Sequence, residues 1–333
     1  MHLKPSSFFL FFLIGSFIFL RISGSLFTRF SAPTTLLTDR NFSPNSIDGR
    51  TDLPPECNTH CSYPNWNDLY NAVYTDRKPT NKPVIDPKKY AYATLITSDN
   101  FVQVLQVLAY SLKRTNTTAS IIALTPRNRL SLESRKALES SGFLIYELDD
   151  VIPPRGATSR FSEQFLKLRL WELIQFEKII YIDADALVIR NLDHLFLTSL
   201  DFHVTADVAG SFDSFIGGFF VLKPNLFTSF ELLNSIYIYN NYYNPRFAEQ
   251  SFLNYFAKGS ATRLPLTVFP AQNFFCCPYT NLLNPFHIGA IHYASGMIIH
   301  SKPWSFDGVD DPRVSKDVHK IWLKVREEMN RGK

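Results

Sequence analysis

The sequence has few cysteines and no concentrated basic charge. Four of its 333 residues are cysteine, the formal net charge is +4, and no five consecutive residues are all basic. Scattered Lys and Arg are typical of an ordinary solvated surface, so we expect no nucleic-acid partner.

The cysteines are too few and too unevenly spaced for a zinc site. They form two groups, Cys57 with Cys61 and the adjacent Cys276 with Cys277. No further Cys or His pair has the spacing of a zinc-binding motif. A disulfide between the two groups suits an oxidising compartment, but the sequence leaves its connectivity open.

Long apolar runs are also rare, and the main one lies at the start of the chain. Residues 8–20 read FFLFFLIGSFIFL. This run is shorter than the roughly 20 residues of a spanning helix, and extending it to residue 27 places Arg21 inside. We favour a signal anchor over 1–27, and a cleaved signal peptide remains the alternative. Either one directs the chain into the secretory pathway, where Asn41 and Asn116 are candidate glycosylation sites.

Residues 28–87 are rich in Pro, Ser, Thr, Asn and Asp, which is typical of a flexible stem. Residues 88–333 then show alternating strand and helix patterns without an internal repeat. The expected strands are 90–97, 120–124, 143–147, 179–182, 202–206 and 218–222. The expected helices are 101–112, 131–141, 163–174, 226–239, 249–256 and 314–328. This alternation predicts an α/β fold with a mostly parallel central sheet.

The most informative stretch is KIIYIDADAL, from Lys178 to Leu187. Its apolar, β-branched run is typical of a buried strand, and it stops at Asp183 and Asp185. Ligands of open α/β sheets bind at the carboxyl ends of strands. We expect the two acids, without a neighbouring Lys or Arg partner, to repel each other unless a cation lies between them. A divalent ion such as Mn2+ or Mg2+ suits these oxygens and can bridge to a diphosphate, which indicates nucleotide-sugar chemistry.

Several segments of the chain resemble the family-eight retaining glycosyltransferases, whose best-known member is glycogenin and which include plant and fungal Golgi enzymes. The resemblance covers residues 90–304 and rests most specifically on KLRLWELIQFEKIIYIDADALVIRNLDHLF, from Lys167. It is supported by TLITSDNFVQVLQVLAYSL from Thr94, GGFFVLKPN from Gly217, EQSFLNYF from Glu249, and KPW from Lys302.

The resemblance implies a GT-A fold, a Mn2+ ion and a UDP-sugar donor of the hexosyl or glucuronosyl type. The acceptor would be a carbohydrate, a glycolipid or a protein, and the enzyme a type II Golgi membrane protein with a lumenal catalytic domain. Asp183, Asp185 and a closing histidine would bind the metal. The remaining implied site residues are Leu95, Thr97 and Phe101 for uracil and ribose, Lys302 for the diphosphate, and Lys167, Glu249 and Gln250 near the sugar.

The sequence departs from the family pattern at three places. Ile216, Gly217 and Gly218 stand where the family has Asn-Ser-Gly, and Glu249 stands where it has Asp. The closing segment is longer than usual, so His292 and His300 both compete to be the third ligand, and we favour His292. The strand-ending Asp207 is a further site candidate.

Two other classes of function remain open. A lumenal sugar-nucleotide- or glycan-binding protein without catalytic activity is the main alternative, because two polar contacts to the sugar are missing. A nucleotidyltransferase is disfavoured because the turn at 98–100 lacks the glycine of a phosphate-binding loop.

Overall fold

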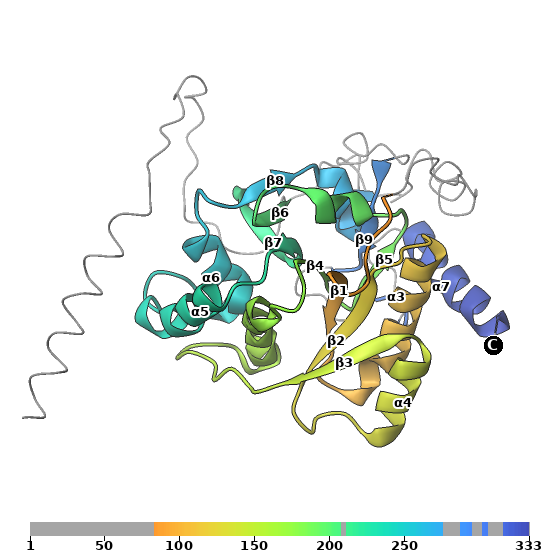
Figure 1. The fold of residues 1–333 in the computed structure, drawn as a ribbon, viewed down its shortest axis with the longest axis horizontal. Coiled ribbons are helices and arrows are strands. Elements are labelled where there is room, and N and C mark those ends of the chain that lie inside the picture. Colours follow the sequence, from red (N-terminus) through yellow and green to blue (C-terminus); the bar gives the residue numbers. More distant parts are fainter. Residues whose placement is uncertain (1–82, 208–210, 276–286, 295–301, 306–315, 333) are drawn as a thin grey trace, which may run out of the picture. The chain divides into compact units, whose positions relative to one another are not determined.

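A seven-stranded sheet runs through the part of the chain that the computed structural model describes (Figure 1), which comprises residues 83–207, 211–275, 287–294, 302–305 and 316–332. These residues lie in one compact unit, Asp52–Lys333. The expected leader, residues 28–82 of the expected stem, the four cysteines and His300 lie outside the described residues. None of the helices in the described ranges has the length and apolarity to cross a membrane.

The sheet is mixed but mostly parallel, which confirms the predicted fold class. Its order is β3 (Phe143–Leu148), β2 (Ser120–Pro126), β1 (Tyr90–Leu95), β4 (Lys178–Ile182), β7 (Ser211–Leu222), β6 (Phe202–Asp207) and β8 (Thr262–Leu264). The first four strands are parallel, and β8 is parallel to β6. Only β7 runs antiparallel to its neighbours, β4 and β6.

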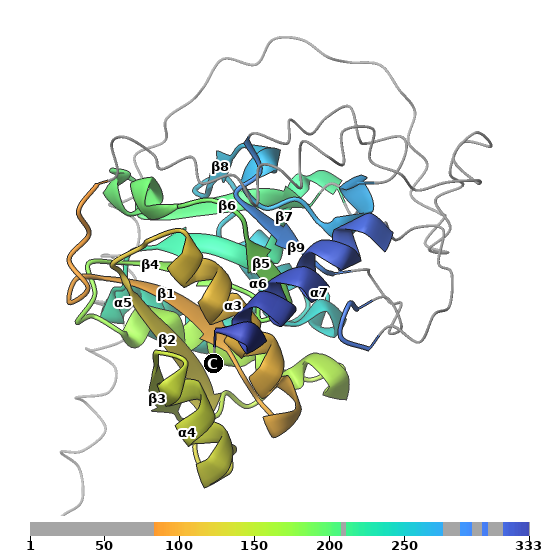
Figure 2. The same cartoon turned by 90° about the vertical axis from the view of Figure 1, so that its right-hand side faces the viewer.

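Helices cover both faces of this sheet (Figure 2). One side carries α3 (Val102–Arg114) and α4 (Leu132–Ser140), and α7 (Lys316–Arg331) packs beside α3. The other side carries η3 (Ser159–Glu172), α5 (Leu226–Ile238) and α6 (Ala248–Phe256). The short 3-10 helices are η2 (Asp99–Phe101), η4 (Asp193–Leu197), η5 (Pro245–Phe247), η6 (Leu266–Val268) and η7 (Gln272–Phe275).

The β4 strand is buried on both faces, as its sequence predicts. Ile179 and Tyr181 face the core beneath η3, α5 and α6. Ile180 and Ile182 face the core beneath α3 and α4. Side chains of a strand alternate between the two faces of its sheet, so a strand in a central position needs apolar residues throughout.

A second, two-stranded sheet was not predicted. It pairs β5 (Ala186–Val188) antiparallel with β9 (Ala290–His292), so that Ala186 lies opposite His292. The amide of Tyr293 also donates to the carbonyl of Asp185, at 2.8 Å. Three-residue strands are too short to show a period, so sequence patterns miss them.

Several predicted boundaries were wrong. The expected helix 163–174 is a 3-10 helix that begins at Ser159 and ends at Glu172, because Leu173 leaves the helical conformation with ψ at 54°. The expected strand 218–222 is longer, since β7 begins at Ser211. The last helix continues to Arg331, three residues beyond the expected end, and the expected start at 314 lies outside the described residues.

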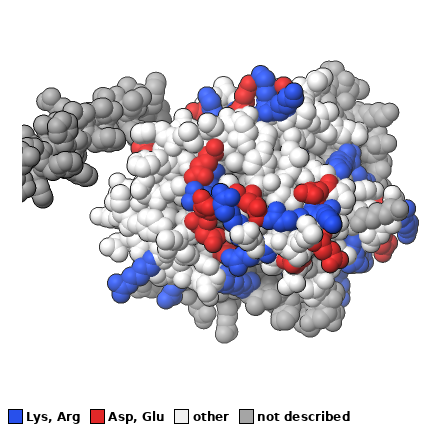
Figure 3. Space-filling view, turned by 60° about the horizontal axis from the view of Figure 1, so that its bottom comes forward, with Lys and Arg blue, Asp and Glu red and all other residues white. Residues whose placement is uncertain are grey.

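Charged side chains on the surface are mixed in sign. On the face that Figure 3 shows, Lys and Arg lie interspersed with Asp and Glu. Ion pairs near this surface include Arg127 with Asp149 at 2.5 Å and Arg129 with Glu163 at 2.8 Å. Exposed pairs of this kind add little to stability, about 0–1 kcal/mol each.

Candidate active site

Two acids lie at the carboxyl end of β4. The strand ends at Ile182, and the amide of Asp183 donates to the carbonyl of Gly218 on β7, at 2.8 Å. This bond continues the β4–β7 ladder by one residue and fixes the position of the Asp183 backbone. The side chains of Asp183 and Asp185 are 23% and 20% exposed, so both open to solvent at the edge of a buried strand.

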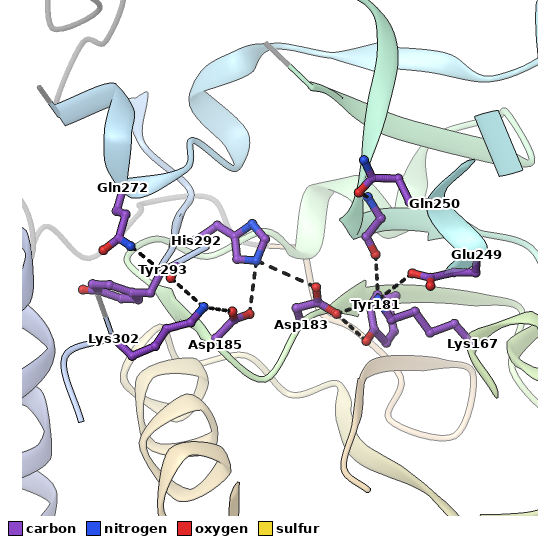
Figure 4. Close-up of polar contacts among 11 residues, drawn as sticks. Lys167, Tyr181, Asp183, Asp185, Glu249, Gln250, Gln272, His292, Tyr293 and Lys302 are labelled. Carbon is purple, nitrogen blue, oxygen red and sulfur yellow. Dashed lines mark hydrogen bonds and ion pairs between the residues drawn. The ribbon is translucent and has the colours of Figure 1, made fainter. Parts of the chain in front are cut away.

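His292 reaches these acids from the far end of the sequence. The β5–β9 pairing holds its backbone, and its amide also donates to the carbonyl of Pro270, at 3.0 Å. Its ring stacks on Phe269, with 4.7 Å between ring centres. The Nε2 atom lies 3.1 Å from Asp185 Oδ1 and 3.8 Å from Asp183 Oδ2 (Figure 4).

These three residues form a donor set that fits a divalent cation. One ligand atom from each lies within 4.8 Å of the others. Two carboxylates and one imidazole suit Mn2+, and less closely Mg2+, which prefers oxygen ligands. The Nδ1 atom of His292 is buried and has no hydrogen-bond partner among the described residues. The other ring nitrogen, Nε2, faces the two aspartates.

Lys302 places a positive charge beside the same acids. Its ammonium donates to Asp185 Oδ2 and to the carbonyl of Tyr293, the latter at 2.8 Å. Burial alone would raise the pKa of Asp185, but Lys302 and His292 outweigh burial and hold that pKa well below its usual range. Asp185 is therefore ionised at neutral pH and ready to bind a cation.

Asp183 has a different cationic partner, Lys167 on η3. The Lys167 ammonium lies 2.9 Å from Asp183 Oδ1 and 2.7 Å from Glu249 Oε1, and it donates to the carbonyl of Gly217 at 3.1 Å. The Tyr181 hydroxyl donates to the same Asp183 oxygen, at 2.6 Å. The expectation that the acidic pair lacks Lys partners was wrong, because both lysines come from distant segments of the chain.

Burial and neighbouring charges shift the pKa values of Lys167 and Glu249. Lys167 and Glu249 are 2% and 3% exposed. Burial lowers the pKa of Lys167, but the carboxylates of Asp183 and Glu249 outweigh burial and raise it overall. Burial raises the pKa of Glu249, against the opposing charge of Lys167. Lys167 is therefore cationic at neutral pH, and two carboxylates share its charge.

Gln250 follows Glu249 on α6 and ties β6 to β7. Its Oε1 accepts from the amide of Gly217 at 2.8 Å, and its Nε2 donates to Asp207 Oδ2 at 3.0 Å. The structure thus brings Lys167, Glu249, Gln250 and Asp207 to the edge at which Asp183 lies.

Two glycines allow these side chains to approach the sheet. A Cβ atom on Gly217 would lie 2.8 Å from Glu249 Oε1. A Cβ atom on Gly218 would lie 2.7 Å from His292 Cε1 and 3.0 Å from Asp183 Oδ2. The sequence shows the two glycines, but only the structure shows that carboxylates and an imidazole fill the space beside them.

The predicted nucleoside-binding residues follow β1. Ala93 on β1 is the register partner of Tyr181, so Leu95 lies at the same end of the sheet as Asp183. Leu95 is buried at 6% exposure, Thr97 is half-buried, and Phe101 in η2 is 40% exposed. Leu95 therefore belongs to the core, whereas Thr97 and Phe101 remain accessible to a ligand. Sequence reasoning placed Tyr181 only in the strand and missed the contact of its hydroxyl with Asp183.

No family model matches the chain, but its sequence is similar to galactinol synthases, a glycogenin and a glucuronosyltransferase. Galactinol synthase 5 of Arabidopsis thaliana is 26% identical over 279 residues, which cover 72% of this chain and 81% of that protein. Glycogenin-1 of Caenorhabditis elegans is 37% identical over 159 residues. UDP-glucuronate:xylan alpha-glucuronosyltransferase 1 of Arabidopsis thaliana is 32% identical over 175 residues. The last two matches cover 46% and 51% of this chain, and 36% and 25% of the respective relatives.

Solved structures show the same fold. A structure of LgtC superimposes with a TM-score of 0.54 at 17% identity, over 72% of this chain and 95% of that one. The glycosyltransferase GlyE of Streptococcus pneumoniae TIGR4 gives 0.53 at 16% identity, over 73% of this chain and 63% of that one. This likeness shows the fold, and the sequence matches show that the chain is similar to family-eight glycosyltransferases such as glycogenin and galactinol synthase.

Proposed function

We propose that the chain is a metal-dependent, retaining glycosyltransferase that moves a sugar from a UDP-sugar to a hydroxyl group of an acceptor. The observation that carries this proposal is the convergence of Asp183, Asp185 and His292 at the carboxyl end of β4, with Lys302 beside them. Such an edge is where open α/β sheets bind nucleotides.

The three ligands would hold Mn2+ or Mg2+. A bound divalent ion supplies positive charge against the departing diphosphate, as a Lewis acid does. Asp183 and Asp185 would give the oxygen ligands that both ions prefer, and His292 would complete the set from β9. The imidazole of His292 stacks on Phe269, and its backbone pairs with β5, so both contacts position it in the protein alone.

Lys302 would act on the diphosphate side of the site. Its ammonium neutralises Asp185 in the protein alone. With a cation held by Asp183, Asp185 and His292, the Lys302 ammonium would be free to donate to a phosphate oxygen. Removing one such stabiliser from a site that excludes water typically raises the barrier by roughly 3–4 kcal/mol.

The transfer breaks the bond between the anomeric carbon and the diphosphate oxygen. A new bond forms between that carbon and the acceptor oxygen, and the acceptor proton passes to the departing UDP. Thr97 and Phe101 would contact the nucleoside beyond β1, with Leu95 supporting them from the core. Glu249, Gln250 and Lys167 would position the sugar. Retention of configuration follows from the family that the chain resembles.

The relatives support a UDP-sugar donor and leave a choice of acceptor. One is named for UDP-glucuronate and xylan, and others are glycogenin and galactinol synthases. We propose a carbohydrate, glycolipid or protein acceptor in the lumen of the secretory pathway, reached through the apolar segment within residues 1–27. Asn116, a candidate glycosylation site, is exposed in the turn that follows α3.

The deciding experiment measures UDP release by the purified protein with a panel of UDP-sugars, with and without Mn2+. Metal-dependent release above the rate of an Asp183→Asn, Asp185→Asn double variant is the expected result. Metal-dependent binding of UDP without any release would instead favour the alternative, a binding protein on the same fold.

A further inference from the structure

A chain of hydrogen bonds links the last helix, α7, to Lys302. The Lys302 ammonium donates to the carbonyl of Tyr293 at 2.8 Å, and the side-chain amide of Gln272 donates to the same carbonyl at 3.1 Å (Figure 4). The other end of that amide, Oε1, lies 2.9 Å from Nε2 of His319, which is a residue of α7. The chain therefore starts in α7, passes through η7 and ends beside the candidate cation site.

The chemistry of the partners fixes the direction of each bond. A backbone carbonyl only accepts, so Gln272 must turn its N–H group towards Tyr293 and its oxygen towards His319. That oxygen also only accepts, so Nε2 of His319 carries the hydrogen of the bond between them. Reversing the Gln272 amide would set its oxygen against the Tyr293 carbonyl. His319 therefore holds the amide in the orientation that serves this carbonyl.

The carbonyl of Tyr293 belongs to a rigid part of the molecule. Gln272 and Tyr293 are fully buried, and His319 is 3% exposed. The amide of Tyr293 donates to the carbonyl of Asp185, and its hydroxyl donates to the carbonyl of Val318 on α7, at 3.0 Å. Leaving any buried polar partner unsatisfied costs free energy, so these bonds hold the Tyr293 peptide in one position.

This carbonyl is the acceptor that Lys302 can keep when the site is loaded. Among the described residues the ammonium donates to two oxygens, Asp185 Oδ2 and the Tyr293 carbonyl. Asp185 would be shared with a divalent ion, whereas the Tyr293 carbonyl lies outside the proposed ligand set. An ammonium has three N–H groups, so one that is held by the carbonyl leaves others for a phosphate oxygen.

We propose that Gln272 and His319 are positioning residues, which fix the Tyr293 carbonyl and through it hold the Lys302 ammonium where a diphosphate binds. The inference rests on the proposed function and adds two residues to its machinery. Neither residue touches the donor, because each acts through the carbonyl. The last helix thereby becomes part of the frame of the site.

The test is a double-mutant cycle of Gln272→Met and Lys302→Met in the full chain. Calorimetry at saturating Mn2+ gives the Kd of UDP for each variant. Gln272→Met should weaken UDP binding by about fivefold, the effect of roughly one hydrogen bond. In the Lys302→Met background the same change should have an effect below about twofold, because the group through which Gln272 acts is missing. A purely structural role of Gln272 would weaken binding equally in both backgrounds.

A second pair of variants tests His319 with Gln272 left in place. His319→Gln offers an amide N–H to the Gln272 oxygen and should keep the Kd of UDP within about twofold of the natural value. His319→Met has no donor and should weaken binding by about two- to threefold. Val325→Ala, a change at another buried position on α7, is the control for lost packing. It should lower the melting temperature and leave the Kd of UDP unchanged.

The outcomes separate this inference from the proposed function. Equal losses for Gln272→Met in both backgrounds, or no loss in either, would overturn the inference and leave the proposed function standing. Equal effects of the two His319 variants would overturn the role of His319. If melting curves show that Gln272→Met does not fold, His319→Met takes its place in the cycle. An unaltered chain that binds no UDP in the presence of Mn2+ would overturn the proposed function, and this inference with it.

Discussion

The Glu249 carboxylate occupies the place that a side chain on residue 217 would need. Glu249 Oε1 lies 2.8 Å from the Cβ position of Gly217, closer than real Cβ contacts come. The family pattern has Ser at this position and Asp at position 249. The two departures of this chain therefore depend on each other: the longer acid fits because residue 217 has no side chain.

This dependence predicts a rescue. Gly217→Ser alone should lower kcat/KM by at least roughly tenfold, because the added atoms displace Glu249 and the Lys167 bond. Adding Glu249→Asp shortens the acid and should restore part of that loss. A double-mutant cycle on UDP release measures the coupling, and strictly additive effects of the two changes would show that the residues do not compete for space.

We expect Asp183 and Asp185 to serve the candidate metal site through their charge and not through packing. Asp183→Asn or Asp185→Asn should abolish metal-dependent transfer while circular dichroism and the melting temperature show a folded protein. Near-normal turnover of either variant at limiting Mn2+ would contradict the role of that residue as a ligand.

The two competing histidines can be separated by titration. His292→Ala should raise the Mn2+ concentration needed for half-maximal activity by about 10- to 100-fold, since His292 lies 3.1 Å from Asp185. His300→Ala is the matched comparison and should have a much smaller effect. The reverse order of effects would move the third ligand to His300.

Lys302 should have opposite effects on metal and donor. Its ammonium and a metal ion compete for Asp185, so Lys302→Met should tighten Mn2+ binding to the free protein by roughly tenfold. The same variant should raise KM for the UDP-sugar, because the diphosphate loses a partner. Calorimetry with Mn2+ alone and kinetics at saturating Mn2+ measure the two effects, and weaker Mn2+ binding would rule out the competition.

Stability should fall on the acid side because of His203. This histidine on β6 is buried, and burial, followed by the charge of Lys178, lowers its pKa. The folded-state pKa is thus below the unfolded value of about 6.5. Neutral His203 therefore contributes fully to the free energy of unfolding above about pH 6.5, and this contribution is lost as the pH falls through the folded-state pKa. His203→Gln should flatten the decline in urea unfolding free energy between pH 7.5 and 5, whereas His287→Gln, at an exposed position, should not.

Much of the fold could be predicted because its signals are local. The buried run before Asp183 gave β4, and helical periodicity gave α3, α5 and α6. The pairing of β5 with β9 was not predictable, because three residues carry no period and His292 is 107 positions from Asp185. The Asp pair stood out in sequence, but its lysine partners did not, since Lys167 and Lys302 reach it only through tertiary packing.

The β5–β9 pairing also orders the assembly of the site during synthesis. A chain emerges from the ribosome with its amino-terminal part first. A nascent chain that ends before Ala290 already contains all seven strands of the main sheet and both acids, but it lacks β9 and His292. Such a chain holds at most two of the three metal ligands. The candidate cation site is therefore complete only after synthesis has passed His292.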